Sequence, residues 1–225
     1  MLIIFDQKIP KAAQQKLGKI GELFPFTSQG IVYPGISGHP DIFIFQYEQQ
    51  LILAPQISIS LIKKLKENNI NFNFGNQNLG NLHPLTTPYN VAYRNDLFIG
   101  NSEFADSSIL ELAEHYVWIE STQAYARCNS LILDKAHIIT SEISVAQKLD
   151  FSLLVSAKPI LLEGFANGFF GGCAGILDSR IFLIGSLKYH PQGDEISAYC
   201  RLAGYEIIEL YDGPLFDGGG IFFIE

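Results

Sequence analysis

The chain has 225 residues and a mass of 25.0 kDa; 48% of the residues are hydrophobic and 17% are charged, which predicts one folded domain over residues 1–225 and excludes a disordered chain. With 15 Lys and Arg against 23 Asp and Glu, the net charge is −8, so we expect neither nucleic acid nor a membrane surface as a partner. No apolar run approaches the ~20 residues that cross a bilayer, and the apolar start Leu2–Phe5 lacks the features of a signal peptide. We therefore expect a cytoplasmic protein.

In chain order, the clearest predicted elements are four β hairpins, each made of two apolar runs around a short polar turn. These hairpins are Asp41–Phe45 with Leu51–Ala54, Val91–Tyr93 with Leu97–Ile99, Ser130–Leu133 with His137–Thr140, and Ala174–Leu177 with Arg180–Ile184.

A helix and a further strand accompany each hairpin, and one more helix and strand precede the first. The spacing of apolar residues predicts five helices, over Pro10–Leu17, Ser58–Lys66, Ser107–His115, Ser141–Leu149 and Asp194–Ala203. The strands expected after them are Glu22–Phe24, Ile70–Phe72, Tyr116–Ile119, Phe151–Leu154 and Glu206–Leu210.

The repeating unit is thus strand, helix, strand, loop, strand, and the two ends of the chain complete the fifth copy. Gly220–Ile224 ends the chain without a return strand, and Leu2–Phe5 begins it with a spare one. Pairing these two strands would close a ring and leave no bare ends. The pattern therefore predicts an α/β (α+β) fold, a five-fold pseudo-symmetric α/β propeller. An open α/β sheet is the alternative, but it leaves five matching units and matched termini unexplained.

In such a ring, equivalent loops face a common centre, and the segment before each hairpin carries polar residues or glycines. The five segments are Gly38–Asp41, Tyr89–Asn90, Arg127–Asn129, Gly171–Cys173 and Asp217–Gly220. Loops presented by a rigid scaffold are where binding and catalysis concentrate. We therefore expect a central polar pocket.

Several of these segments resemble the pentein fold, the five-bladed α/β propeller of the guanidine-group-modifying enzymes, and most closely an uncharacterised bacterial branch of that superfamily. They are Ser37–Ile42, Pro88–Tyr93, Tyr125–Asn129, Ile138–Ser141 and Gly164–Gly175. The superfamily includes deiminases, dimethylarginine hydrolases and amidinotransferases, together with non-catalytic members such as a ribosome anti-association factor. The resemblance implies a central channel with a nucleophilic cysteine, a histidine and carboxylates that bind a guanidinium group.

The chain departs from this pattern at its end. In several enzymatic relatives the cysteine follows a glycine-rich stretch in the last unit, whereas here Gly218–Gly220 is followed by Ile221. The remaining candidates for a nucleophile are Cys128 and Cys173, and either would need a neighbouring His or Arg to lower its pKa. Free cysteines are often buried as small hydrophobic residues, and this reading is favoured for each of them.

His39 and Asp41 are the best candidates for acid–base catalysis, because a Gly-His-Pro-Asp turn can hold a histidine beside a carboxylate. They could equally begin a strand and accept backbone N–H groups there. The candidate ligand-binding residues are Asn90, Arg127, Asn129, Asn167 and Asp217. The three asparagines and Asp217 could equally be turn-formers whose side chains bond to the local backbone.

No metal and no cofactor are expected. The three cysteines, Cys128, Cys173 and Cys200, are too widely spaced for a disulfide framework or a zinc motif. The remaining histidines lack metal-ligand spacing, and the glycine runs match neither a phosphate loop nor a dinucleotide motif.

Three functions remain open on this evidence. The first is a hydrolase or transferase that acts on a small guanidino or amidino compound through a Cys–His pair. The second is a non-catalytic module that binds a small polar or guanidino ligand, and the third is a protein-binding propeller. We expect a monomer or a homodimer.

Overall fold

The computed structural model describes residues 1–225 as a mixed α/β fold with five three-stranded sheets. The first sheet joins the two ends of the chain. Its central strand β1 (Leu2–Asp6) pairs antiparallel with β15 (Ile221–Ile224) and parallel with β2 (Glu22–Phe26). The terminal strands therefore pair as expected, with Leu2 opposite Ile224.

The other four sheets follow in chain order and repeat this arrangement, with a central strand between one antiparallel and one parallel neighbour. Their strands are β3 (Ile44–Tyr47), β4 (Gln50–Leu53) and β5 (Asn71–Phe74); β6 (Ala92–Arg94), β7 (Leu97–Gly100) and β8 (Val117–Glu120); β9 (Ser130–Ile132), β10 (Ile138–Thr140) and β11 (Ser152–Leu154); and β12 (Ala174–Leu177), β13 (Arg180–Leu183) and β14 (Glu206–Glu209). The chain forms five separate sheets, so the alternative prediction of one open α/β sheet is wrong.

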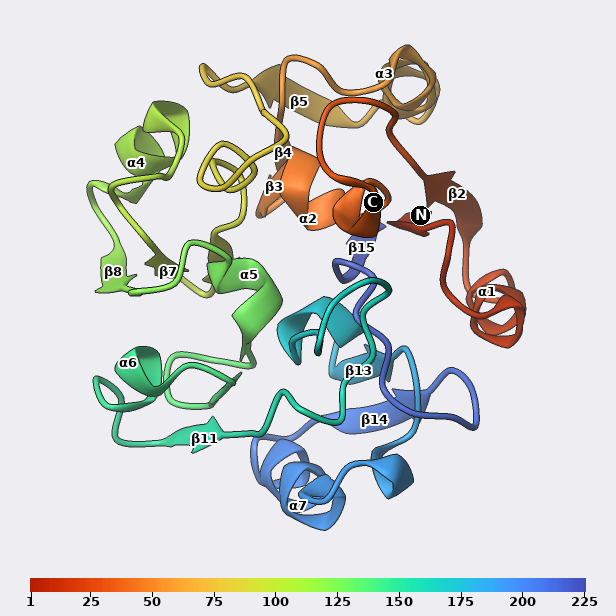
Figure 1. The fold of residues 1–225 in the computed structure, drawn as a ribbon, viewed down its shortest axis with the longest axis vertical. Helices are drawn as coiled ribbons and strands as arrows, with labels where there is room; N and C mark the ends of the chain where they lie inside the picture. The colour runs from red at the N-terminus through yellow and green to blue at the C-terminus, as the bar shows by residue number, and fades with distance from the viewer.

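One helix connects the two parallel strands of each sheet, because parallel neighbours need a crossover connection. These helices are α1 (Lys11–Leu17), α3 (Ile59–Glu67), α4 (Ser107–Ala113), α6 (Ile143–Ala146) and α7 (Gly193–Leu202). Figure 1 shows them at the periphery of the molecule. None is long and apolar enough to span a bilayer.

The helix α6 is the shortest of the five and covers only part of its predicted range. The helix α3 begins at a side-chain cap, because Ser58 accepts a hydrogen bond from the Leu61 N–H at 3.3 Å. No side chain caps α6, and its four residues include β-branched Ile143 and Val145, which lower helix propensity. The segment therefore makes one turn rather than the predicted nine residues.

The sequence analysis missed several short helical turns: α2 (Pro40–Phe43), α5 (Ala126–Asn129) and the 3₁₀ turns η1 (Pro34–Ile36), η2 (Gly171–Cys173) and η3 (Leu187–Tyr189). All of them precede a hairpin except η3, which lies between β13 and α7. The strand predicted from Asp41 begins only at Ile44, because Pro40 occupies the first position of a helical turn. A short apolar run does not by itself distinguish a helical turn from a strand. Asp41 and residues 127–129 therefore lie on helical turns rather than on extended chain, whereas Asn90 and Asp217 lie in loops.

The first strands of the hairpins, together with β15, surround a cavity of about 510 Å³. Its lining includes residues of β3, β6, β9, β12 and β15, which come from all five sheets. In Figure 1, α2, α5 and β15 lie toward the middle of the molecule. The fold thus brings the segments that precede the hairpins to one central region.

Candidate functional site

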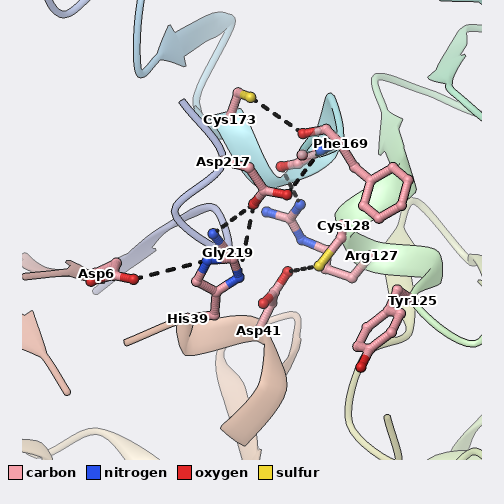
Figure 2. A network of polar contacts seen from close by, with 12 residues as sticks. Asp6, His39, Asp41, Tyr125, Arg127, Cys128, Phe169, Cys173, Asp217 and Gly219 are labelled. Atoms are coloured by element: carbon pink, nitrogen blue, oxygen red, sulfur yellow. Dashed lines mark hydrogen bonds and ion pairs between the residues drawn. The ribbon is translucent and has the colours of Figure 1, made fainter. Parts of the chain in front are cut away.

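Several segments that are distant in sequence end at one buried place, shown in Figure 2. We call their side chains the central polar group: Asp6, His39, Asp41, Asn90, Cys128 and Asp217. Each is at most 4% exposed. Asp6 ends β1, His39 and Asp41 flank the start of α2, Cys128 lies in α5, and Asp217 precedes β15. Burial of so many polar side chains requires hydrogen bonds or charge compensation within the group.

The His39 ring lies between two carboxylates (Figure 2). Its Nε2 atom is 3.9 Å from Oδ2 of Asp6, and its Nδ1 atom is 3.8 Å from Oδ1 of Asp217. Neither separation is a hydrogen bond, and Nδ1 has no hydrogen-bond partner. Burial lowers the pKa of His39, and the carboxylates of Asp41 and Asp6 oppose this effect. The ring is therefore a neutral imidazole at pH 7, which can accept a proton.

Gly219 allows the ring to pack this closely. It has a φ of +67°, and a Cβ atom at this position would lie 2.5 Å from Cβ of His39 and 2.7 Å from Oδ1 of Asp41. Both the left-handed backbone and the lack of a side chain are therefore needed at residue 219.

Cys128 and Asp41 form the most direct contact of the group. The thiol of Cys128 donates to Oδ2 of Asp41 at 2.9 Å, whereas Oδ1 of Asp41 has no hydrogen-bond partner. Burial raises the pKa of Asp41 to about 6. Burial, and then the charge of Asp41, raise the pKa of Cys128 well above its ordinary value, so the thiol is protonated at neutral pH.

Asn90 fixes this contact from the other side. Its Nδ2 atom donates to the sulfur of Cys128 at 3.3 Å, and its Oδ1 atom accepts from the backbone N–H of Cys128 at 3.2 Å and of Arg127 at 2.9 Å. One ligating atom from each of His39, Asp41 and Cys128 lies within 4.8 Å of the others. The structure therefore brings a histidine, a carboxyl group and a thiol into one buried cluster.

Asp217 is held by the backbone. Its carboxylate accepts the N–H of Phe169 at 2.9 Å and the N–H of Gly219 at 3.0 Å. Burial raises the pKa of Asp217 to about 6, against the lowering effect of these hydrogen bonds and of Arg127. Its side chain packs against Gly172, where a Cβ atom would lie 1.9 Å from Oδ1.

Arg127 connects the central polar group with the cavity. Its guanidinium donates to the carbonyl of Gly171 at 2.8 Å and of Ala174 at 3.3 Å, and lies 5.7 Å from the ring centre of Phe222. Its charge lowers the pKa of both Asp41 and Asp217. Arg127 also lines the 510 Å³ cavity, whereas no member of the central polar group does so. Other polar residues that line the cavity are Gln46, Glu48, Arg94 and Asp96.

Three of the expected site residues lie outside both the central polar group and the cavity. Cys173 packs in an apolar cluster, and its thiol donates to the carbonyl of Phe169 at 3.2 Å (Figure 2). The helical turn η2 directs this side chain away from His39, so the expected pairing of the two is not formed. The side-chain amides of Asn129 and Asn167 donate to the carbonyls of Tyr125 and Gly168, both at 2.9 Å, as local turn-forming residues do.

Asp6 is the member of the group that the sequence analysis missed. It directly follows the apolar run of β1, and Lys8 donates its backbone N–H to Oδ1 at 2.8 Å. The pairing of β1 with β15 was the available signal, because it places the end of β1 beside the segment that contains Asp217.

Comparison with solved structures shows which known proteins share this fold. An amidinotransferase, SxtG, of the saxitoxin pathway of Microseira wollei is similar over 92% of this chain and 87% of its own, with a TM-score of 0.54 and 10% identity. DDAH from Pseudomonas aeruginosa, complexed with citrulline, is similar over 92% and 91%, with a TM-score of 0.50 and 10% identity. The agmatine deiminase of C. jejuni is similar over 84% and 70%, with a TM-score of 0.50 and 11% identity. All three belong to the pentein superfamily, and the chain shares their fold.

The sequence then defines the family. Residues 4–222 match the model of a family of unknown function, DUF6873, and the chain belongs to that family. No curated protein matches the sequence at a significant level.

Proposed function

We propose that this protein is a hydrolase or transferase that acts on a small guanidino or amidino compound, with Cys128 as the nucleophile and His39 and Asp41 as proton carriers. The observation that carries the proposal is the cluster of His39, Asp41 and Cys128, whose ligating atoms lie within 4.8 Å of one another. In this proposal residues 1–225 form a single domain, a closed five-bladed propeller with the reaction at its centre.

The hydrogen bond between Cys128 and Asp41 supplies the first step. The thiol proton passes to Oδ2 of Asp41, and the thiolate attacks the central carbon of the bound guanidinium, whose C=N electron pair moves onto nitrogen. The C–N bond to the leaving amine then breaks, and this amine takes the proton that Asp41 received from the thiol. Water in a hydrolase, or an amine in a transferase, next attacks the S-bound carbon and passes a proton to the neutral ring of His39. The S–C bond then breaks, and His39 returns this proton to the thiolate.

The surroundings of Arg127 support a guanidinium as the substrate group. A planar guanidinium already lies beside the central polar group, held by two backbone carbonyls and the ring of Phe222, and close enough to Asp41 and Asp217 to lower the pKa of both. The three carboxyl groups of Asp6, Asp41 and Asp217 outnumber the single charge of Arg127. Oδ1 of Asp41 also has no hydrogen-bond partner, so acceptors remain for the N–H groups of a second planar cation. The cavity that Arg127 lines would give a small molecule access to the central polar group. The amidinotransferase, the agmatine deiminase and the citrulline complex among the similar structures agree with this substrate class.

A non-catalytic ligand-binding protein is the second candidate, and a specific observation favours it. No member of the central polar group lines the cavity, and the thiol of Cys128 is protonated. The cavity alone could then bind a small polar compound through Glu48, Asp96 and Arg94. In that case the buried cluster would only support the fold.

The experiment that separates the two is a screen of guanidino and amidino compounds for release of ammonia or amine. It uses the unaltered protein, Cys128→Ser, and Cys173→Ser as the matched control. We expect Cys128→Ser to lose at least about 1,000-fold in kcat, as removal of a nucleophile does, and Cys173→Ser to retain activity. Equal turnover by Cys128→Ser would overturn the thiol mechanism. Binding of a compound without turnover, measured by calorimetry, would instead support the ligand-binding protein.

A further inference from the structure

We infer that His39, Asp41 and Cys128 form a site for one divalent transition-metal ion of the class that includes Zn²⁺ and Co²⁺. An imidazole, a carboxylate and a thiolate are all ligands of such ions. Here they come from two segments, at residues 39–41 and at residue 128, and all three are buried. Sequence spacing could not reveal this set, because Cys128 lies 87 positions after Asp41.

Unpartnered atoms point to a missing ligand. In the whole chain, three buried side-chain nitrogen or oxygen atoms have no hydrogen-bond partner, and two of them are Nδ1 of His39 and Oδ1 of Asp41. Each such atom costs about 1–3 kcal/mol when it stays unsatisfied. A single ion bound at these two atoms and at the sulfur of Cys128 would satisfy both.

Each ligand also has a supporting group around it. Nε2 of His39 faces Oδ2 of Asp6 at 3.9 Å, beyond hydrogen-bond distance. If the Asp6 carboxylate moved about 1 Å closer, it would accept the Nε2–H and orient a ligating imidazole. Nδ2 of Asn90 donates to the sulfur of Cys128 at 3.3 Å, and a thiolate accepts such a hydrogen bond well. Metal–ligand bonds of about 2.0–2.3 Å place tetrahedral ligands about 3.3–3.8 Å apart. One possible ligand atom of each residue lies within 4.8 Å of the others, so metal binding would bring these atoms about 1 Å closer together.

Charge balance favours a divalent ion at this place. The ion would replace the proton of Cys128, and its two charges would be balanced by the thiolate and the carboxylate of Asp41. The complex is thus neutral, in a region where burial penalises net charge. Oδ1 of Asp217 lies 3.8 Å from Nδ1 of His39 and is a further oxygen that could ligate a metal ion close to the site.

The inference shares its residues with the proposed function but does not require it. A metal on the sulfur engages the electron pair that the nucleophile would use, so the metal-bound and nucleophilic states exclude each other. Because metal binding is measured without a substrate, failure of one proposal leaves the other standing.

The test is titration with Co²⁺ alone. The full chain is stripped with a chelator, and a second sample is refolded from denaturant with one equivalent of Co²⁺, since the site is buried. We expect a thiolate-to-cobalt charge-transfer band that saturates at one ion per chain and disappears when Zn²⁺ is added. Calorimetry in buffers of different ionisation enthalpy should show that one proton is released per ion.

Variants then assign the ligands, with circular dichroism to confirm that each one folds. Cys128→Ser and His39→Gln should lose the band, whereas Cys173→Ser, which removes a buried thiol outside the cluster, should keep it. Asp6→Asn should weaken binding about 10–100-fold, as loss of an outer-sphere partner does. The inference is wrong if neither preparation of the unaltered chain shows the band, or if Cys128→Ser or His39→Gln keeps it at full strength.

Discussion

The sulfur of Cys128 donates to Oδ2 of Asp41 at 2.9 Å, although the two residues are 87 positions apart in the chain. This contact has two opposite effects on the chemistry of the thiol. It gives the proton of Cys128 a direct acceptor, and the negative charge of Asp41 also raises the pKa of the thiol. The resting protein therefore holds a protected thiol, which a bound cation can activate by offsetting that charge.

The first prediction concerns the reactivity of the three thiols. Cys128, Cys173 and Cys200 are all buried, and burial raises the pKa of each. Iodoacetamide at neutral pH should therefore modify none of them in the native protein and all of them after unfolding, as measured by mass spectrometry. Rapid modification of Cys128 in the native state would contradict a buried thiol with a raised pKa.

Stability should depend on pH through Asp217. The pKa of its carboxyl group is 3.8 in the unfolded chain and about 6 in the folded one. Between these two pH values the folded state therefore binds a proton that the unfolded state has lost. Raising the pH from about 4 to 7 should thus lower the free energy of unfolding by up to about 3 kcal/mol through this group.

The variant Asp217→Asn isolates this effect, because groups common to both proteins cancel in the difference. Urea unfolding in the presence of a chelator should show the variant gaining stability relative to the unaltered protein as the pH rises. A difference that stays constant with pH would contradict the raised pKa of Asp217.

Gly219→Ala should be strongly destabilising, because the added Cβ meets His39 and Asp41 and the backbone has a positive φ. Gly30→Ala is the matched control, since Gly30 has a φ of +71° but nothing within 4 Å of its Cβ position. We expect the control to lose about 1 kcal/mol from backbone strain. The Gly219 variant should lose at least about 2 kcal/mol more, which is typical of overpacking. Equal losses in urea unfolding would mean that the contact at Gly219 is not tight.

Arg127→Met should be more damaging than Arg180→Met, although both guanidinium groups lie 5.7 Å from a phenylalanine ring. Arg127 satisfies the carbonyls of Gly171 and Ala174, whereas Arg180 is 41% exposed and pairs with Asp178 at the surface. The expected losses in stability are about 2–3 kcal/mol for Arg127→Met and less than about 1 kcal/mol for Arg180→Met. Thermal unfolding of both variants measures these losses in stability. A larger loss for Arg180→Met than for Arg127→Met would show that Arg127 does not stabilise the fold through these carbonyls.

Much of the fold was predictable because hairpins and helices leave local patterns. The turn between Tyr47 and Gln50 and the helix that follows Ser58 are examples, and the unmatched strands at the two ends predicted the pairing of β1 with β15. The helical turn from Pro40 was not predictable in the same way. Its apolar residues continue into β3 without a change of pattern.

The sequence indicated most members of the central polar group, but neither all of them nor their geometry. His39, Asp41 and Cys128 stood out as polar residues or thiols before apolar strands, and they do meet. Cys173 occupied an equivalent position, yet its side chain points into the core, because side-chain direction at a helical turn depends on the local dihedral angles. Asp6 was missed because it does not precede a hairpin, although the predicted pairing of β1 with β15 places the end of β1 beside the segment that contains Asp217.

Labelling with a haloacetamidine probes cation recognition at Cys128, because this reagent carries an amidinium group beside an alkylating carbon. We expect it to modify Cys128 alone, at least about 10-fold faster than the neutral haloacetamide, since the carboxylates hold the cation next to the sulfur. Asp41→Asn should remove this preference. Equal rates for the two reagents, or no modification of Cys128, would contradict a cation-recognising thiol site at the centre of this fold.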